Sequence, residues 1–167
     1  DYVAVQAAGL ECLALFCTAS GDLAAEYVGL LCEFCGLIGG PQASRLVAMR
    51  GLFDLALVFG VPGLADREYP DPNGPGMLRT PKATVIVATL AAGLYDADAE
   101  LQTAAVEGFA KLLLHGRIDA EVDDVLLGLF AAYLHPANIT AHRLRQCLSF
   151  FWQVYAFGSR DNQERIA

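Results

Sequence analysis

The chain has few basic residues for its size. Its 167 residues include 11 Lys and Arg against 19 Asp and Glu, which gives a net charge of −8. A protein that binds nucleic acid over most of its surface needs an excess of positive charge, because that charge attracts the phosphates. The net negative charge excludes this class of protein. From Thr140 onward, however, the sequence has four Arg against two carboxylates, Asp161 and Glu164. Any contact with nucleic acid must therefore be local or shared with a partner.

The sequence also lacks an apolar run long enough to cross a membrane, although 55% of its residues are hydrophobic. A membrane helix needs about 20 mostly apolar residues, and charged residues interrupt the apolar N-terminal third at shorter intervals. A glycine-rich phosphate loop with Lys-Ser/Thr and an HExxH motif are absent too. We therefore expect no membrane partner, no small-molecule substrate, no cofactor and no enzymatic activity. Without an initiator Met or a signal peptide, we expect a piece of a longer chain.

The five cysteines are an odd number, and reduced thiols fit a nuclear or cytosolic protein. Cys32 and Cys35 form a CxxC motif, which can hold zinc or act in redox chemistry. Zinc needs two more ligands at comparable spacing, and the sequence offers none nearby, so free thiols packed in a helical core are favoured. His115, His135 and His142 lie at predicted helix ends, where the helix dipole accounts for them. We predict no metal site.

Apolar or small residues at helical spacing recur in four stretches, at offsets of +3, +6, +7 and +10 from a starting residue. The starting residues are Gln6, Arg45, Gln102 and Arg145. They are 39, 57 and 43 residues apart, and the long step contains the Pro- and Gly-rich residues 60–80. Without that stretch the spacing is about 40 residues, which is typical of the helix pairs of HEAT and armadillo arrays. The predicted fold is all-α, a HEAT-repeat solenoid of antiparallel helix pairs.

We predict about eight helices in one continuous solenoid. Residues 1–59 would form three helices and residues 81–167 the other five, since capping residues and prolines separate the apolar segments. Residues 60–80 are predicted to form a flexible insertion loop on the surface. Alternating apolar and polar residues, the pattern of a half-buried strand, are almost absent. We therefore expect no sheet.

Three stretches together resemble one known family. They are LRQCLSFF at residues 144–151, followed by Val154-Tyr155 and Asn162-Gln163, then VEGFAKL at residues 106–112 and RGLFDL at residues 50–55. Their order and spacing are similar to the C-terminal half of condensin subunit 3, the CAP-G type HEAT subunit of eukaryotic condensin. Trp152 stands where we would expect Phe-Pro in the family, which leaves that helix unkinked.

The resemblance implies a non-catalytic subunit. Proteins of this family form a curved HEAT solenoid, bind a segment of the kleisin subunit along a groove, and with it hold double-stranded DNA on a positively charged surface during mitotic chromosome condensation. It implies a location in the nucleus and on chromosomes, or in the cytoplasm during interphase. The sequence does not identify the kleisin contacts. The alternative is a generic HEAT-repeat scaffold or adaptor that binds protein without DNA.

Six basic residues are candidates for DNA contacts: Arg45, Arg50, Lys111, Arg143, Arg145 and Arg160. Arg45 and Arg145 share one repeat position, where pairing with a neighbouring carboxylate competes with phosphate contact. Arg143 lies off the apolar face of its helix, and Arg160 would begin a helix, where backbone N–H groups favour anions. The remaining two lie on the second helices of their pairs, which usually form a solenoid's inner wall.

Two carboxylates, Asp54 and Glu107, occur on apolar helices of different repeats. A catalytic pair would need to face one cleft, and no further motif supports such a cleft. We expect these groups to lie on solvated faces or to form salt bridges.

Overall fold

The computed structural model describes residues 2–36, 40–71, 73–119 and 121–167. The elements in chain order are α1 (Tyr2–Cys17), α2 (Gly21–Gly36), α3 (Gln42–Phe59), α4 (Val61–Leu64), β1 (Glu68–Pro70), β2 (Met77–Arg79), α5 (Ala83–Ala91), the 3-10 helix η1 (Ala92–Tyr95), α6 (Ala99–Leu114), α7 (Val122–Leu134), the 3-10 helix η2 (Pro136–Thr140), α8 (His142–Gly158) and α9 (Arg160–Ile166). Across these described ranges, none of the helices combines the length and the apolar character that a membrane crossing requires.

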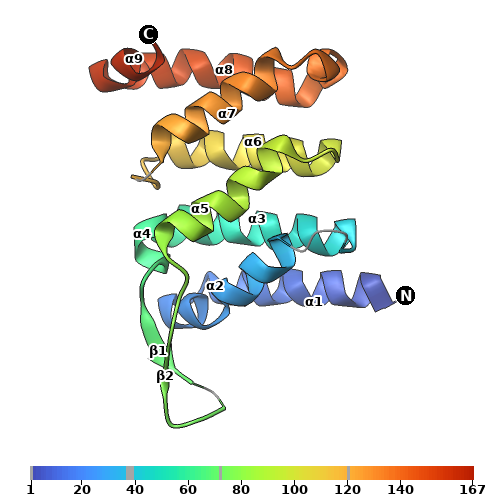
Figure 1. The fold of residues 1–167 in the computed structure, drawn as a ribbon, viewed down its shortest axis with the longest axis vertical. Helices are drawn as coiled ribbons and strands as arrows, with labels where there is room; N and C mark the ends of the chain where they lie inside the picture. Colours follow the sequence, from blue (N-terminus) through green and yellow to red (C-terminus); the bar gives the residue numbers. More distant parts are fainter. Residues whose placement is uncertain (1, 37–39, 72, 120) are drawn as a thin grey trace.

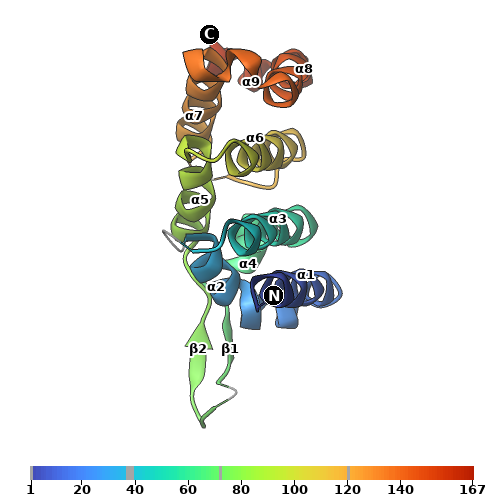
Figure 2. The same cartoon turned by 90° about the vertical axis from the view of Figure 1, so that its right-hand side faces the viewer.

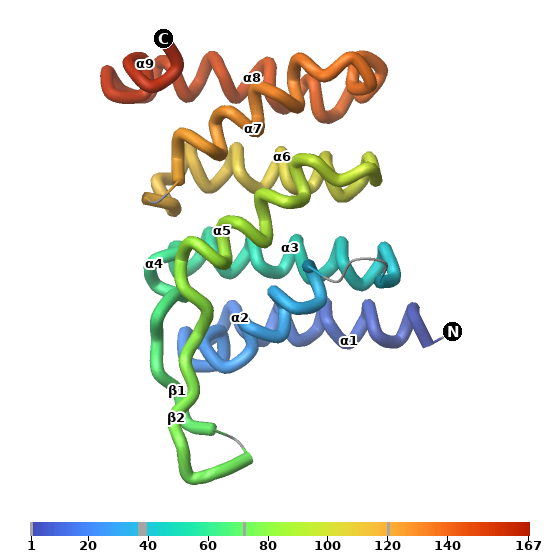
Figure 3. Tube along the Cα trace, viewed as in Figure 1, coloured from blue at the N-terminus to red at the C-terminus, as the bar shows by residue number. Residues whose placement is uncertain are grey.

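The helices form two layers. In Figures 1 and 2, α1, α3, α6 and α8 lie one above another on one side, and α2, α5 and α7 form the other side. Apart from the β1–β2 hairpin, which runs back past α1 and α2, the trace in Figure 3 advances from the N-terminal end to the C-terminal end of the stack. Successive helix pairs therefore stack on their neighbours, as in a HEAT solenoid. The predicted all-α class is confirmed.

The four helices predicted to share one template are those of a single layer. In α3, α6 and α8 the template positions are buried, apart from the half-buried Trp152. In α1 the predicted positions are displaced by one residue, because Phe16 is 71% exposed whereas Leu10, Ala14 and Cys17 are buried. These three fit a template that starts at Ala7. The physical reason is that α1 is the end helix of its layer and has one neighbour there, α3. Because α1 is apolar all round, its sequence does not show which side is buried.

Two glycines allow close approach between helices of this layer. A Cβ atom on Gly51 would lie 2.7 Å from the Cβ of Ala14, and one on Gly108 would lie 2.4 Å from the ring of Phe53. The Phe53 ring packs edge-on against Phe109, with 5.1 Å between the ring centroids. Gly108 therefore makes the space in which Phe53 of α3 packs against α6.

The segment 60–80 contains secondary structure that the sequence did not predict. It begins with α4 and continues as a β-hairpin in which Glu68 pairs with Arg79 and Tyr69 with Leu78. The hairpin extends past α2, away from the α8 end of the stack (Figures 1 and 2). The expectation of no sheet was wrong, because local backbone pairing forms this short and mostly exposed hairpin without an alternating apolar pattern. The flexibility of the segment stays a prediction.

The root of the hairpin is attached to α2. The Arg67 guanidinium donates to the carbonyl of Gly21 at 2.7 Å and to Oδ1 of Asp22 at 2.9 Å. The backbone N–H of Arg67 donates to Oγ1 of the buried Thr80 at 2.8 Å. These bonds fix the point at which the hairpin leaves the stack.

Candidate functional site

Helical periodicity places one row of side chains from each of α3, α6 and α8 on the same lateral surface. Residues at i, i+4, i+7, i+11 and i+14 of a helix lie on one face. In α3 the row is Ala43, Val47, Arg50, Asp54 and Leu57; in α6 it is Glu100, Ala104, Glu107, Lys111 and Leu114; in α8 it is Arg143, Cys147, Phe150, Val154 and Phe157. We call these three rows the lateral face.

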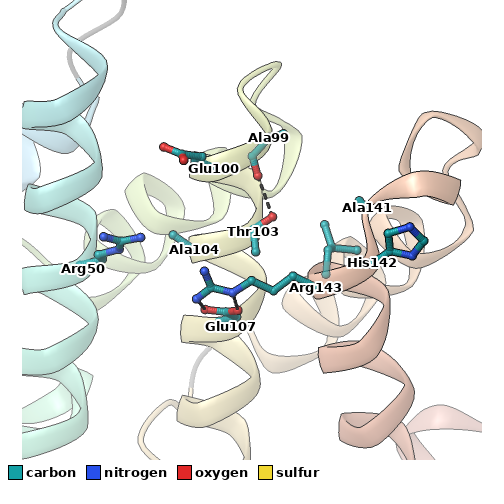
Figure 4. Close-up of a pocket in the computed structure, with 10 residues that line it drawn as sticks. Arg50, Ala99, Glu100, Thr103, Ala104, Glu107, Ala141, His142 and Arg143 are labelled. Atoms are coloured by element: carbon teal, nitrogen blue, oxygen red, sulfur yellow. Dashed lines mark hydrogen bonds and ion pairs between the residues drawn. The ribbon is translucent and has the colours of Figure 1, made fainter.

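Two adjoining grooves lie on the lateral face. The first is lined by Arg50 of α3, by α6 from Ala99 to Glu107, and by Arg143 with its neighbours at the start of α8 (Figure 4). The second lies between α3 and α6, and Asp54 and Lys111 contribute to its walls. Both grooves include Arg50, Glu107 and Arg143. The structure thus brings three of the six candidate cations, Arg50, Lys111 and Arg143, onto one continuous surface.

Arg143 is paired with Glu107 across two repeats. Its Nε donates to Oε1 at 2.5 Å and its Nη2 donates to Oε2 at 2.7 Å. The Arg143 side chain is 70% exposed and that of Glu107 is 24% exposed. The exposure expected of Arg143 is present, but the carboxylate of Glu107 neutralises its charge in this geometry.

Arg50 of α3 and Lys111 of α6 are exposed, and both line the second groove together with Asp54. Neither forms an ion pair with a residue in the described part of the chain. Burial raises the pKa of Asp54, and the positive charges of Lys111 and Arg50 oppose that rise. These two cations are therefore close enough to influence Asp54 while remaining available to an outside ligand.

Arg45 and Arg145 are engaged inside the solenoid. Arg45 donates to Oδ2 of Asp96 at 2.5 Å, and both side chains are at most 20% exposed. Burial raises the pKa of Asp96, but the backbone N–H of Asp98 and the Arg45 guanidinium outweigh it, so the pKa is below its ordinary value. Arg145 donates to the Tyr133 carbonyl at 3.0 Å and lies 4.8 Å from the centre of its ring. Arg45 thus joins α3 to the turn between η1 and α6, and Arg145 joins α8 to α7.

Arg160 lies apart from the lateral face, at the start of α9. Its side chain is 88% exposed and donates to Glu164 one turn later at 2.9 Å. The N-terminus of this seven-residue helix is capped by Ser159, whose hydroxyl accepts the N–H of Asn162. Arg160 is thus accessible but isolated from the other candidate cations.

The cysteines of the CxxC motif lie on α2 and are buried. Burial is the main cause that raises the pKa of Cys32 to about 12 and that of Cys35 to about 11. A protonated thiol is a poor nucleophile and a poor metal ligand. Within the described ranges, no group of three or more His, Cys, Asp or Glu is arranged to hold a metal ion. The motif therefore contributes to core packing.

Sequence reasoning missed one feature of the lateral face. Phe150, Val154 and Phe157 of α8 are exposed, whereas the template offsets from Arg145 describe only the opposite face of this helix. The signal was available, because these residues lie four and three apart on the side opposite Leu148 and Tyr155. A helix that is apolar on two sides either is buried on both or presents one side to a partner.

Comparison with known proteins assigns the chain to a family. Residues 1–167 match the family described as nuclear condensing complex subunits, C-terminal domain. Condensin complex subunit 3 of Schizosaccharomyces pombe is 36% identical over 162 residues, which cover 95% of this chain and 16% of that protein. Condensin complex subunit 3 of Xenopus laevis is 25% identical over 184 residues, covering 93% of this chain and 17% of that protein.

A solved structure has the same fold. The chain in the crystal structure of the S. pombe condensin Cnd3-Cnd2 subcomplex superposes with a TM-score of 0.75 at 33% identity, over 95% of this chain and 19% of that chain. The chain thus spans less than a fifth of each of these relatives. Because the family match covers its whole length, the chain belongs to the condensin subunit 3 family, in the C-terminal domain of nuclear condensing complex subunits.

Proposed function

We propose that this chain is a non-catalytic HEAT-repeat part of condensin that binds the kleisin subunit and, jointly with it, double-stranded DNA in mitotic chromosome condensation. It acts on chromosomes in the nucleus. The observation that carries the proposal is the similarity, over 95% of the chain, to a condensin subunit solved in a subcomplex with a second protein, Cnd2. A stacked helical scaffold that presents one lateral face is suited to holding an extended partner.

The charges on the lateral face support a joint DNA site rather than an independent one. Its cations Arg50, Lys111 and Arg143 are balanced by three carboxylates, Asp54, Glu100 and Glu107. DNA affinity rests largely on Lys and Arg that neutralise phosphates and release counterions. A balanced face binds DNA weakly alone, so positive charge from the kleisin completes the site.

The alternative function is a scaffold that binds protein only. The net charge of −8 and the pairing of Arg143 with Glu107 favour it. The two functions differ in the salt dependence of DNA affinity, because counterion release makes the logarithm of the binding constant fall linearly with the logarithm of salt concentration.

The test is fluorescence anisotropy of a short labelled duplex, titrated with this chain, with the kleisin subunit and with both, over a range of salt concentrations. We expect tight, salt-sensitive binding only with both proteins. Arg50→Glu and Lys111→Glu should each weaken it and reduce the salt slope by about one. Arg79→Glu is the matched control, because Arg79 is 68% exposed but lies on the hairpin. If the chain adds no salt-sensitive DNA affinity to that of kleisin alone while kleisin still binds it, the protein-only scaffold is correct. If it adds affinity that Arg50→Glu with Lys111→Glu leaves unchanged, the DNA contacts lie outside the lateral face.

A further inference from the structure

One side of α1 is apolar and open to solvent. The buried residues of this helix, Leu10, Ala14 and Cys17, lie on the side that packs against α3 and α2. The helical period places four residues on the opposite side: Val5, Cys12, Leu15 and Phe16. Cys12 is exposed, and the other three are between 63% and 71% exposed. An apolar side of this extent is typical of a helix that packs against a further element.

A preceding helix pair would cover this open side of α1. Each pair in a solenoid buries its apolar faces by stacking on its neighbours, and within the described part of the chain α1 has one neighbour in its layer, α3. The chain matches the C-terminal domain of its family and spans 16% of the S. pombe relative. Because other residues precede a C-terminal domain, we expect the layer to continue beyond α1 in the whole protein.

The β1–β2 hairpin extends past the same end of the stack. It joins α4 to α5 and runs back beyond α2 and α1 (Figures 1 and 3). In Figure 2 it continues the line of the layer formed by α2, α5 and α7. A helix pair that stacked on α1 and α2 as the other pairs stack would therefore lie beside the hairpin.

The two strands are held between a fixed root and a closed turn. Arg67 attaches the root to α2, and the N–H of Asp66 donates to the carbonyl of Pro81 at 3.3 Å. Beyond the strands, the N–H of Asp71 donates to the carbonyl of Gly76 at 2.9 Å. These bonds leave the hairpin pointing away from α5, towards the place of the preceding pair.

The strands present apolar side chains that have little cover. Met77 is 59% exposed and Leu78 is 41% exposed. Tyr69 pairs with Leu78 across the strands, so these two side chains share one face of the hairpin. A two-stranded hairpin on its own is marginally stable in water, and packing against a helix is one way to stabilise it. The chemistry of this hairpin thus favours a helix as its partner.

We infer that the strands of the hairpin pack against the helix pair that precedes α1 in the whole protein. The open side of α1 receives a helix of the same pair. Repeats of a solenoid ordinarily contact only their nearest neighbours, whereas the hairpin, inserted between α3 and α5, would reach past the α1–α2 pair to the pair before it. The contact ties three successive pairs together, and it requires neither DNA nor kleisin.

The experiment uses the whole protein, purified without partners, with the photo-cross-linker p-benzoylphenylalanine in place of Leu78. Irradiation should link position 78 to a peptide that precedes Tyr2, which mass spectrometry identifies. The matched control carries the cross-linker in place of Leu127, which is 68% exposed on α7, near the other end of the stack. The control should not reach that peptide, and circular dichroism melts verify that both proteins fold.

Two outcomes of the cross-linking would overturn the inference. Links from position 78 that stay within residues 1–36 would show that the strands contact only the pair already described. A link to a second molecule would assign the strands to another copy of the protein.

The thiol of Cys12 gives an independent readout. In the 167-residue chain Cys12 is open to a disulfide reagent. In the whole protein it should react about tenfold or more slowly, because a packed thiol is withheld from reagents. A thiol introduced by Leu127→Cys is the control and should react at the same rate in both proteins. Equal rates for Cys12 would show that α1 is uncovered. Protection of Cys12 without a link from position 78 would leave the hairpin free, and either result contradicts the proposed contact.

Discussion

Arg143 of α8 and Glu107 of α6 are joined by two hydrogen bonds across the lateral face, and this pair links successive repeats at the edge of both grooves. The same pair holds the positive charge of Arg143 against a carboxylate. Its two consequences, a link between helices and a neutralised cation, can be separated by changing Glu107 alone.

Glu107→Gln should release the charge of Arg143 and increase DNA affinity in the presence of kleisin, with a salt slope steeper by about one. The melting temperature should change little, because Arg143 is largely exposed and exposed ion pairs contribute little to stability. Glu68→Gln, which releases Arg79 on the hairpin, is the control and should leave the slope unchanged. Weaker DNA binding by Glu107→Gln would show that the pair itself orders the site.

Gly108→Ala should destabilise the solenoid by about 1–3 kcal/mol, because the added Cβ overlaps the Phe53 ring and overpacks the α3–α6 contact. Gly29→Ala on α2 is the matched control. A Cβ there meets nothing within 4 Å, so the higher helix propensity of Ala should stabilise by up to about 1 kcal/mol. Urea unfolding of both variants gives the two free energies. Equal changes in the free energy of unfolding would mean that α3 and α6 can move apart at Gly108 and accept the added Cβ without a loss of stability.

Thr80→Val should cost about 1–3 kcal/mol, because it removes the acceptor of the Arg67 N–H at a position that is 5% exposed. Thr89→Val is the control, since its hydroxyl only donates to the Val85 carbonyl within α5, and it should change stability by less than about 0.5 kcal/mol. Denaturant titration gives the free energy of unfolding of the Thr80→Val and Thr89→Val variants. A negligible cost at Thr80 would show that the hairpin root does not depend on this bond.

Thiol labelling should follow burial. At pH 8 the exposed Cys12 should react with a disulfide reagent in the folded protein, whereas Cys32 and Cys35 should react only after unfolding. Because folding raises the pKa values of Cys32 and Cys35 above the ordinary 9.0, their contribution to stability is complete below about pH 9. It is lost as the pH rises towards about 11 and 12. Rapid labelling of Cys35 in folded protein would contradict its buried position.

The layer of template helices could be predicted because each helix has the same neighbours in every repeat, so the same apolar offsets recur at Arg45, Gln102 and Arg145. The register of α1 could not, because a helix apolar on all sides does not reveal which side is buried until its neighbours are known. Leu10 and Phe16 are equally apolar in sequence, yet one is 5% and the other 71% exposed.

The candidate site could be predicted only in part. Arg50, Lys111 and Arg143 were identified from sequence, but the pairing of Arg143 with Glu107, 36 residues away, depends on how two repeats stack. The β-hairpin was missed because hydrogen bonds between short exposed strands leave little hydrophobic pattern. The exposure of Phe150, Val154 and Phe157 on α8 was missed because hydrophobicity alone does not distinguish a core residue from an exposed one.

The hairpin between α4 and α5 leaves the stack at a root fixed by Arg67 and Thr80, while its far end projects clear of the helices (Figure 1). The hairpin can therefore be longer or shorter beyond this root without altering how the helix pairs stack. A fluorophore or affinity tag inserted near Gly74, which is exposed, would report on the position of the solenoid in an assembled complex without perturbing the lateral face. The same reasoning makes the hairpin the place where related chains can differ most in length while keeping one superhelix.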